Sequence, residues 1–265
     1  MILAKFRLKR NVQKVLKKPN SLESKQAKVG NRHFKFLSEF DGLINGDWFN
    51  PEFWLKAGNV SGTSKGRFTT YFIQTQDNKQ QQVEMVLRHY YRGGLVRHFN
   101  KDKFFFKTLS SSRAVREFDL LSQMWSLNLP VPRPLACQVV SHGFGWFSND
   151  ILIERIEGAK DAYNLLLKKD LTPTVWNEIG KTIRLFHDHH VFHADLNIHN
   201  ILISNQSDIT LIDFDRCAFN LSPNDSWKQA NLERLKRSLE KEKTLNTIFY
   251  YTEQNWSDLL VGYQK

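Results

Sequence analysis

The chain has 265 residues, 41% hydrophobic and 13% aromatic, so it can bury the core of one large or two small domains. Its two cysteines, Cys137 and Cys217, form neither a disulfide framework nor a C-x-x-C metal motif, and this usage suits a reducing compartment. The sequence contains no apolar run long enough for a transmembrane helix. Lys5 and Arg7 interrupt the apolar start of the chain before a signal-peptide core develops. We therefore expect a protein that is neither exported nor membrane-spanning.

Most of the net charge of +11 lies near the N-terminus. Residues 1–32 hold ten Lys or Arg residues and a single acid, which is +9 of the total. We treat residues 1–33 as a basic extension. Within it, the apolar spacing over 8–18 predicts a short amphipathic helix, and the composition of Ser21–Gly30 predicts a linker. A second basic stretch, Arg88–Lys107, is interleaved with aromatic residues. Nucleic acids and anionic lipids both attract such a stretch, and charge alone does not choose between them.

From residue 58 onward, the glycines and the apolar pattern predict a series of short elements. A glycine-rich turn is expected over Gly58–Gly66. The predicted strands are Phe68–Thr75, Val83–Tyr91, Val139–Val140, Ile151–Ile153, Ile201–Ile203 and Thr210–Ile212. The predicted helices are Ser111–Leu127, which Pro130–Pro134 follows, Thr174–His190 and Trp227–Leu239. Strands dominate the first half and helices the second, so we expect an α+β fold of two lobes. The N-lobe is predicted over 34–153 and the C-lobe over 154–265, with a hinge at Glu154–Gly158.

Two motifs after the second helix carry the chemistry. Residues His193–Asn200 read H-A-D-L-N-I-H-N, and Asp213-Phe214-Asp215 begins thirteen residues after Asn200. The pair resembles the protein-kinase catalytic loop H-R-D-L-x-x-x-N and its D-F-G motif. Phosphoryl transfer needs a carboxylate near the attacking hydroxyl and oxygen ligands that hold Mg²⁺ against the phosphates of ATP. We predict that Asp195 takes the first role and that Asn200 and Asp213 take the second.

The N-terminal half offers candidates for binding ATP. A kinase covers the phosphates with a glycine-rich loop, pairs them with a strand cation and orients that cation with a helix glutamate. The candidates are Gly62, Lys65 and Gly66 in the loop, Arg88 as the cation and Glu117 as its partner. The glycine spacing is not G-x-G-x-x-G, and an ordinary hairpin turn remains an alternative. Arg88 replaces the usual lysine, so its detailed geometry is open. Adenine is expected to meet hinge backbone groups at Glu154 and Ile156.

Several kinase features are missing. Ala194 stands where protein kinases have the arginine that reads a phosphorylated activation loop, and no A-P-E motif follows Asp213. Only 52 residues remain after Asp213, and position 197 lacks the lysine of serine/threonine kinases. A small-molecule or glycolipid acceptor therefore fits better than a protein acceptor.

The chain resembles the 3-deoxy-D-manno-octulosonic acid (Kdo) kinase family of Gram-negative bacteria, relatives of the lipopolysaccharide core heptose kinases. The segments that carry the resemblance are 62–67, 87–95, 129–134, 193–202, 211–217 and 251–256. It covers roughly residues 34–265 and implies a bilobal protein-kinase-like fold. The N-lobe would be mainly antiparallel sheet plus one helix, and the C-lobe a reduced helical one.

The resemblance also implies a reaction and a place. ATP would phosphorylate the 4-hydroxyl of Kdo on Kdo-lipid IVA at the cytoplasmic face of the inner membrane, with the protein attached peripherally. Arg92, Arg97 and Asn197 become candidates for contact with the substrate or the membrane, and Phe104–Phe106 for contact with the interface.

Rival functions stay open. A heptose kinase is the alternative within the same class, and a catalytically silent kinase-like scaffold is an alternative outside it. A nucleic-acid-binding protein is favoured only by the charge, so no nucleic acid is expected, and no obligate protein partner is evident. Five histidines crowd residues 187–199. They lack a zinc motif such as H-E-x-x-H, so we do not expect them to bind a metal.

Overall fold

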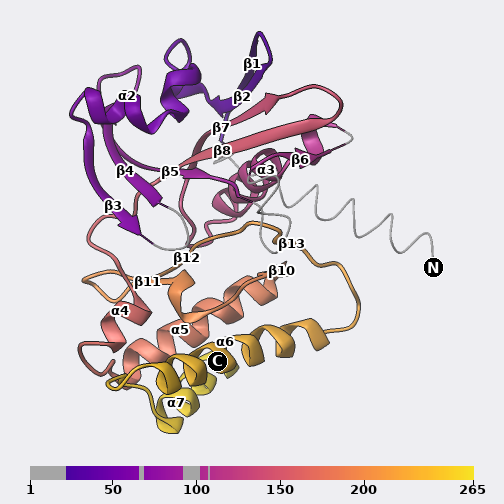
Figure 1. Cartoon of the computed structure of the whole chain (residues 1–265). Helices are drawn as coiled ribbons and strands as arrows, with labels where there is room; N and C mark the ends of the chain where they lie inside the picture. Colours follow the sequence, from indigo (N-terminus) through magenta and orange to yellow (C-terminus); the bar gives the residue numbers. More distant parts are fainter. Residues whose placement is uncertain (1–21, 66–68, 92–101, 107) are drawn as a thin grey trace. The chain divides into compact units, whose positions relative to one another are not determined.

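The computed structural model describes residues 22–65, 69–91, 102–106 and 108–265, and the chain is drawn in Figure 1. An antiparallel sheet occupies the first half and most helices the second, which confirms the α+β prediction. The chain divides into two compact units. Unit 1 runs through Asn128 and resumes at Arg133–Arg155, and unit 2 comprises Leu129–Pro132 and Ile156–Lys265. The lobe limits expected from the sequence, 34–153 and 154–265, stay a prediction.

Unit 1 is built on an eight-stranded sheet. Its strand order is β1-β2-β7-β8-β5-β4-β3, with β6 paired to β8, and all pairings are antiparallel. The strands are β1 (Ser24–Val29), β2 (Arg32–Leu37), β3 (Val60–Lys65), β4 (Thr69–Gln76), β5 (Gln82–His89), β6 (Phe104–Phe105), β7 (Pro134–Ser141) and β8 (Trp146–Glu154). In β5 the buried residues Val83, Met85 and Leu87 alternate with less buried ones. Arg88 therefore lies on the face opposite these apolar residues.

One long helix, α3 (Arg113–Ser126), packs against β7 and β8. Its apolar residues recur at helical spacing, and Ala114, Phe118 and Leu121 are buried against the sheet. Glu117 is buried on the same helix. The helix predicted over 111–127 is thus confirmed, and it carries a charged residue into the core of unit 1.

The N-terminal part of unit 1 was not foreseen. The linker prediction for Ser21–Gly30 is wrong, because β1 pairs along its whole length with β2. All six β1 residues are exposed, so backbone hydrogen bonds to β2 hold the strand in the sheet. Its sequence has no apolar alternation from which a strand could be predicted. Short helices follow: η1 (Ser38–Phe40), η2 (Gly46–Phe49), α2 (Pro51–Lys56) and, before α3, η4 (Leu109–Ser111). The helix predicted over 8–18 lies outside the described residues.

Unit 2 is mainly helical. Its helices are α4 (Ala162–Leu166), α5 (Pro173–Asp188), η5 (Ile198–Asn200), α6 (Ser226–Leu245) and α7 (Glu253–Gln264). Two small sheets accompany them, one of β9 (Lys160–Asp161), β11 (Ile201–Ile203) and β12 (Ile209–Leu211), the other of β10 (Val191–Phe192) and β13 (Ala218–Phe219). The predicted helices 174–190 and 227–239 are confirmed as α5 and α6. Within the described residues, no helix combines the length and apolar character needed to cross a bilayer.

Candidate active site

The loop from His193 to Asn200 connects β10 with β11 in unit 2, and a buried histidine braces it. His193 Nε2 lies 3.0 Å from the carbonyl oxygen of Ile212, and the Asp195 N–H donates to His193 Nδ1 at 3.2 Å. These contacts require a neutral imidazole with its proton on Nε2. Burial lowers the pKa of His193, which keeps the ring neutral. The histidine therefore ties the loop to the residue that precedes Asp213.

A second brace comes from α6. Asn231 is buried, and its side-chain oxygen accepts from the His193 N–H at 3.2 Å while its amide nitrogen donates to the His193 carbonyl oxygen at 3.0 Å. Both backbone groups of His193 are thus satisfied by one side chain. Sequence reasoning missed Asn231, because a lone asparagine on a polar helix carries no motif.

The backbone at Asp195 is held by two amides of its own loop. Asn197 and Asn200 each donate from Nδ2 to the Asp195 carbonyl oxygen, at 3.0 and 2.9 Å. Asn197 also accepts the His199 N–H through its oxygen, so both ends of this amide act within the loop. In Asn200 the nitrogen is engaged, which leaves the amide oxygen as the end that suits a cation.

The Asp195 carboxylate has a cationic partner that the sequence did not indicate. Arg234 of α6 donates from Nη1 to Asp195 Oδ1 at 2.9 Å, and the Asp195 side chain is 56% exposed. Serine/threonine kinases place a lysine two residues after the aspartate, where this chain has Asn197. Arg234 brings a positive charge to the carboxylate from a helix 39 residues further along the chain.

The second motif follows β12 directly. Asp213 has φ of +65°, a left-handed conformation that is uncommon outside glycine. Phe214 is buried and contacts the rings of Phe186 and His193, with centroids 5.8 and 4.8 Å away. The Ile212 N–H donates to the Asn200 carbonyl oxygen at 3.0 Å, so the two motifs are joined through their backbones. A carboxylate and an amide oxygen from these motifs are hard ligands of the kind that Mg²⁺ prefers.

In unit 1 the structure brings Arg88 and Glu117 together. Arg88 Nη2 lies 2.6 and 2.5 Å from the two carboxylate oxygens of Glu117. The hydroxyl of Tyr90 also donates to Glu117, and Arg88 stacks over the Tyr90 ring at 5.3 Å. Burial, followed by the charge of Glu117, raises the pKa of Tyr90, so the phenol stays protonated and donates. Glu117 and Tyr90 thus fix the guanidinium of Arg88, whose role toward ATP stays a prediction.

The structure describes only some of the other predicted site residues. The turn expected over Gly58–Gly66 is wrong in its extent, because β3 occupies Val60–Lys65 and carries Gly62 at a register shift. Backbone pairing with β4 forms this polar strand without an apolar alternation. Lys65 ends β3, while Gly66, Arg92 and Arg97 lie outside the described residues.

The predicted hinge falls where unit 1 ends. The Glu154 N–H donates to the Arg133 carbonyl oxygen at 2.8 Å, and the Arg155 N–H donates to the Glu84 carbonyl oxygen at 2.9 Å. Ile156 is the first residue of the second segment of unit 2. Because the Glu154 N–H is already engaged, an adenine contact through that donor would have to displace this bond.

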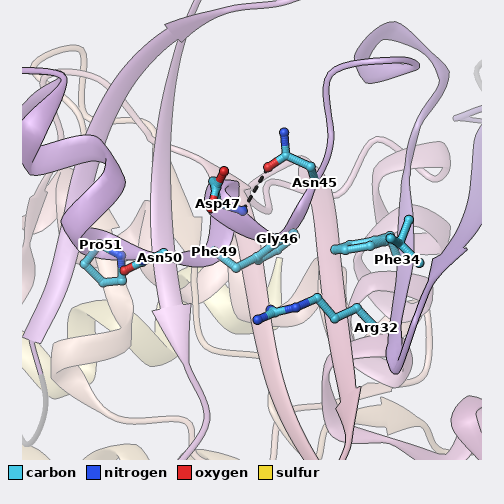
Figure 2. Close-up of a pocket in the computed structure, with 9 residues that line it drawn as sticks. Arg32, Phe34, Asn45, Gly46, Asp47, Phe49, Asn50 and Pro51 are labelled. Carbon is cyan, nitrogen blue, oxygen red and sulfur yellow. Dashed lines mark hydrogen bonds between the residues drawn. The ribbon is translucent and has the colours of Figure 1, made fainter.

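A cavity of about 450 Å³ in unit 1 holds none of the predicted site residues (Figure 2). Arg32 extends into it from β2 and donates from Nη1 to Gln138 at 2.8 Å. Gly46 allows this close approach, because a Cβ there would lie 3.2 Å from the arginine Nε. The other lining residues are Val29, Phe34, Asn45, Asp47, Phe49, Asn50 and Pro51.

Arg88 on strand β5 pairs with Glu117 on helix α3, and the helical unit 2 carries the H-x-D, N and D-F-D motifs, the combination that is typical of a kinase. Residues 51–263 match the lipopolysaccharide kinase (Kdo/WaaP) family, and the chain belongs to that family.

Curated relatives are similar over most of their length. The chain is 46% identical over 237 residues to a 3-deoxy-D-manno-octulosonic acid kinase of Mannheimia succiniciproducens, covering 88% of this chain and 96% of that protein. It is 44% identical to the enzyme of that name from Haemophilus influenzae, covering 87% and 96%. For the Vibrio cholerae enzyme the identity is 42%, covering 78% and 83%. A solved structure described as WaaP in complex with acyl carrier protein is similar with a TM-score of 0.47 and 12% identity, covering 80% of this chain and 81% of that one.

Proposed function

We propose that this chain transfers the γ-phosphoryl group of ATP to the 4-hydroxyl of Kdo on Kdo-lipid IVA, in the biosynthesis of the lipopolysaccharide core. Membership of the lipopolysaccharide kinase family and relatives named as Kdo kinases support the reaction class and the sugar. The choice of the 4-hydroxyl and of lipid IVA rests on the resemblance. Because this acceptor is a lipid, we further propose peripheral attachment at the cytoplasmic face of the inner membrane.

The observation that carries the proposal is the support of Asp195. Its backbone is held by Asn197 and Asn200, and its Oδ1 by Arg234, so Oδ2 is the oxygen left to accept the proton of the sugar hydroxyl. As that proton moves to Asp195, the hydroxyl oxygen bonds to the γ-phosphorus and the bond to the β-phosphate oxygen breaks. The products are the sugar 4-phosphate and ADP. Positioning of the carboxylate is the contribution that this unit makes to the rate.

The remaining roles follow from charge and ligand type. Asn200 and Asp213 would hold Mg²⁺, which supplies positive charge to the phosphates when bound. Arg88, held by Glu117 and Tyr90, would present its guanidinium to the phosphates in bidentate fashion. Backbone groups at Glu154 and Ile156 would meet adenine, and Gly62, Lys65 and Gly66 would cover the phosphates.

The test is transfer of label from ATP to Kdo-lipid IVA in detergent with Mg²⁺, followed by determination of the phosphorylated position. We expect label in the lipid with the wild-type chain and a loss of about 10³-fold or more with Asp195→Asn. Asp170→Asn, at another exposed aspartate of unit 2, should retain activity. Label only on a heptosylated acceptor would identify a heptose kinase. No label on either acceptor, from folded protein that binds ATP, would favour a silent scaffold.

A further inference from the structure

The turn between β7 and β8 presents a phenylalanine to solvent in an unfavourable conformation. Phe144 is 97% exposed and has φ of +50°. Gly143 and Gly145, on either side, have φ of +83° and +78°. Glycine adopts this region freely, but a bulky aromatic residue does so at a cost in backbone strain. The chain therefore accepts both strain and an exposed aromatic ring at one position, which packing within unit 1 does not explain.

A second aromatic segment is attached to this turn. Strand β6 pairs with β8 so that Phe104 faces Phe147 and Phe105 faces Trp146, and the Phe106 N–H donates to the Gly145 carbonyl oxygen at 3.1 Å. The turn and β6 can be followed together in Figure 1. The ring of Phe105 lies so close to Gly145 that a Cβ there would approach it to 2.7 Å. Phe105 nevertheless stays 60% exposed. We call Phe105, Phe144 and Trp146 the aromatic tip.

The aromatic tip has a half-buried base. Phe106 contacts Phe104 and Phe147, with ring centroids 5.9 and 6.3 Å away, and Phe105 meets Trp146 edge to face at 6.0 Å. Arg113 of α3 lies over the Phe104 ring at 4.8 Å. Phe105 and Trp146 are thus mounted on packed side chains, and Phe144 projects from the glycine-flanked turn directly before Trp146.

Two exposed lysines, Lys28 and Lys103, lie on segments that are joined to the aromatic tip. The β1–β2 turn is hydrogen-bonded to its base, since Asn31 and Ser141 exchange bonds of 2.8 and 2.9 Å. The end of β1 that leads into this turn carries Lys28 and Val29, of which Val29 is 66% exposed. Lys103 is exposed and directly precedes β6 in the chain. The carboxylate of Asp102, beside Lys103 in the chain, is 3.4 Å from His89 Nε2.

We propose that the aromatic tip inserts into the headgroup region of an anionic lipid bilayer. A protein partner would need a preformed pocket to receive the Phe144 ring. A bilayer needs none, and a protruding aromatic ring flanked by cations suits its interface. Stable attachment without a spanning helix takes two signals. The sequence supplies the second, because residues 1–21 contain seven Lys or Arg residues and no acid. The inference rests on the proposed function for the choice of a lipid surface.

The test uses the full chain without nucleotide or sugar acceptor, and flotation with vesicles of phosphatidylethanolamine with or without phosphatidylglycerol. We expect the wild type to bind the anionic vesicles and to dissociate as salt is raised. Phe144→Asn should weaken binding about tenfold. Asparagine tolerates positive φ, so this variant should fold with an unchanged or higher Tm. Leu245→Ser, at a residue that is 67% exposed in unit 2, is the matched control and should bind as the wild type does.

Phe144→Trp gives a direct readout of insertion. The fluorescence that this tryptophan adds to that of the wild type should shift to the blue with anionic vesicles. Lipids brominated near the headgroup should quench it. The proposal is overturned if the wild type binds no vesicle, or if Phe144→Asn binds as the wild type does. Equal losses of vesicle binding in Phe144→Asn and Leu245→Ser also overturn it. The same holds if the wild type is a dimer that Phe144→Asn dissociates while vesicle binding stays unchanged. Because the readout is vesicle binding and not kinase activity, failure of this inference can be told apart from failure of the proposed reaction.

Discussion

Arg234 of α6 holds Oδ1 of Asp195 at 2.9 Å, although the two residues are far apart in sequence. Their side chains are 48% and 56% exposed, so the pair adds at most about 1 kcal/mol to the free energy of unfolding. The consequence of the contact is therefore expected in catalysis. A cation on one carboxylate oxygen restricts the rotamer of Asp195, and in the proposed reaction it would direct the other oxygen to the acceptor hydroxyl.

We expect Arg234→Gln to lower kcat about 10- to 100-fold while changing Tm little, because misdirection of a catalytic group is costly. Arg234→Lys should recover part of the loss. Arg237→Gln is the matched control, since Arg237 lies on the same helix, is 65% exposed and meets only Glu233, at 3.9 Å, within the described residues. Steady-state kinetics and thermal unfolding check the prediction. Equal kcat values for the Arg234→Gln and Arg237→Gln variants would contradict it.

Removal of the charge at Glu117 should affect both stability and nucleotide binding. The Glu117 side chain is 2% exposed and Arg88 is 22% exposed, so Glu117→Gln removes a buried negative charge that pairs with the largely buried guanidinium of Arg88. We expect a loss of about 3 kcal/mol in the free energy of unfolding. ATP affinity, measured by calorimetry on the folded variant, should fall about tenfold or more.

The control for this pair is Glu84→Gln. Glu84 pairs with Arg155 at 3.0 Å in the same unit, with exposures of 23% and 35%. Its loss should cost less stability and leave ATP affinity near that of the wild type. Unchanged ATP affinity in Glu117→Gln would remove the phosphate-binding role proposed for Arg88 but not the structural one.

Two glycines set the spacing of α5 and α7. A Cβ at Gly180 would lie 2.0 Å from the Leu259 carbonyl oxygen, and one at Gly262 would lie 2.0 Å from that of Asn177. Because both obstacles are backbone atoms, the helices must separate to admit a methyl group. We expect Gly262→Ala to lower the free energy of unfolding by roughly 3 kcal/mol. Val261→Ala, at the adjacent half-exposed position, should cost under about 1 kcal/mol in urea denaturation. Similar losses for the two variants would show that this spacing is not tight.

Acid should destabilise unit 2 through His187. Burial lowers the pKa of His187 to about 4. A hydrogen bond with Asn231 and the charge of Asp188 oppose this shift, and Lys228 and Arg184 add to it. The native state thus binds fewer protons than the unfolded state between pH 6.5 and 4. The contribution of His187 is present above pH 6.5 and is lost as the pH falls toward 4, by about 3 kcal/mol.

His187→Gln removes this titration and offers a polar group to Tyr263, whose hydroxyl lies 2.8 Å from His187 Nδ1. In urea denaturation at a series of pH values, the free energy of unfolding should depend less on pH in the variant than in the wild type. Some dependence will remain, because burial also lowers the pKa of His193. An equally steep dependence in both proteins would show that His187 does not titrate in this range.

Local pattern was sufficient for much of the fold. In α3 and α5 the apolar residues recur at helical spacing, so the helices were predictable within a few residues. The catalytic motifs were equally visible, since Asp195 and Asn200 lie in one loop and Asp213 follows the next strand but one. The catalytic and metal-binding roles of these residues stay predictions.

Other features gave no local signal. Strand β1 is exposed along its length, so only backbone pairing with β2 shows that it is a strand. The polar residues of β3 were read as a turn for the same reason. Backbone hydrogen bonds do not depend on side-chain pattern, and for that reason sequence periodicity does not report them.

The sequence by itself determined the class of the chain, the reaction chemistry it points to, and the residues that belong to the two motifs. Tertiary structure decided which distant side chains complete them: Arg234 on the carboxylate of Asp195, Asn231 on the backbone of His193, and Glu117 on Arg88. It also decided that Phe144 faces solvent. The physical reason is that hydrogen bonds and ion pairs between remote residues depend on where the packed core places each element, and that placement leaves no periodic trace in the sequence.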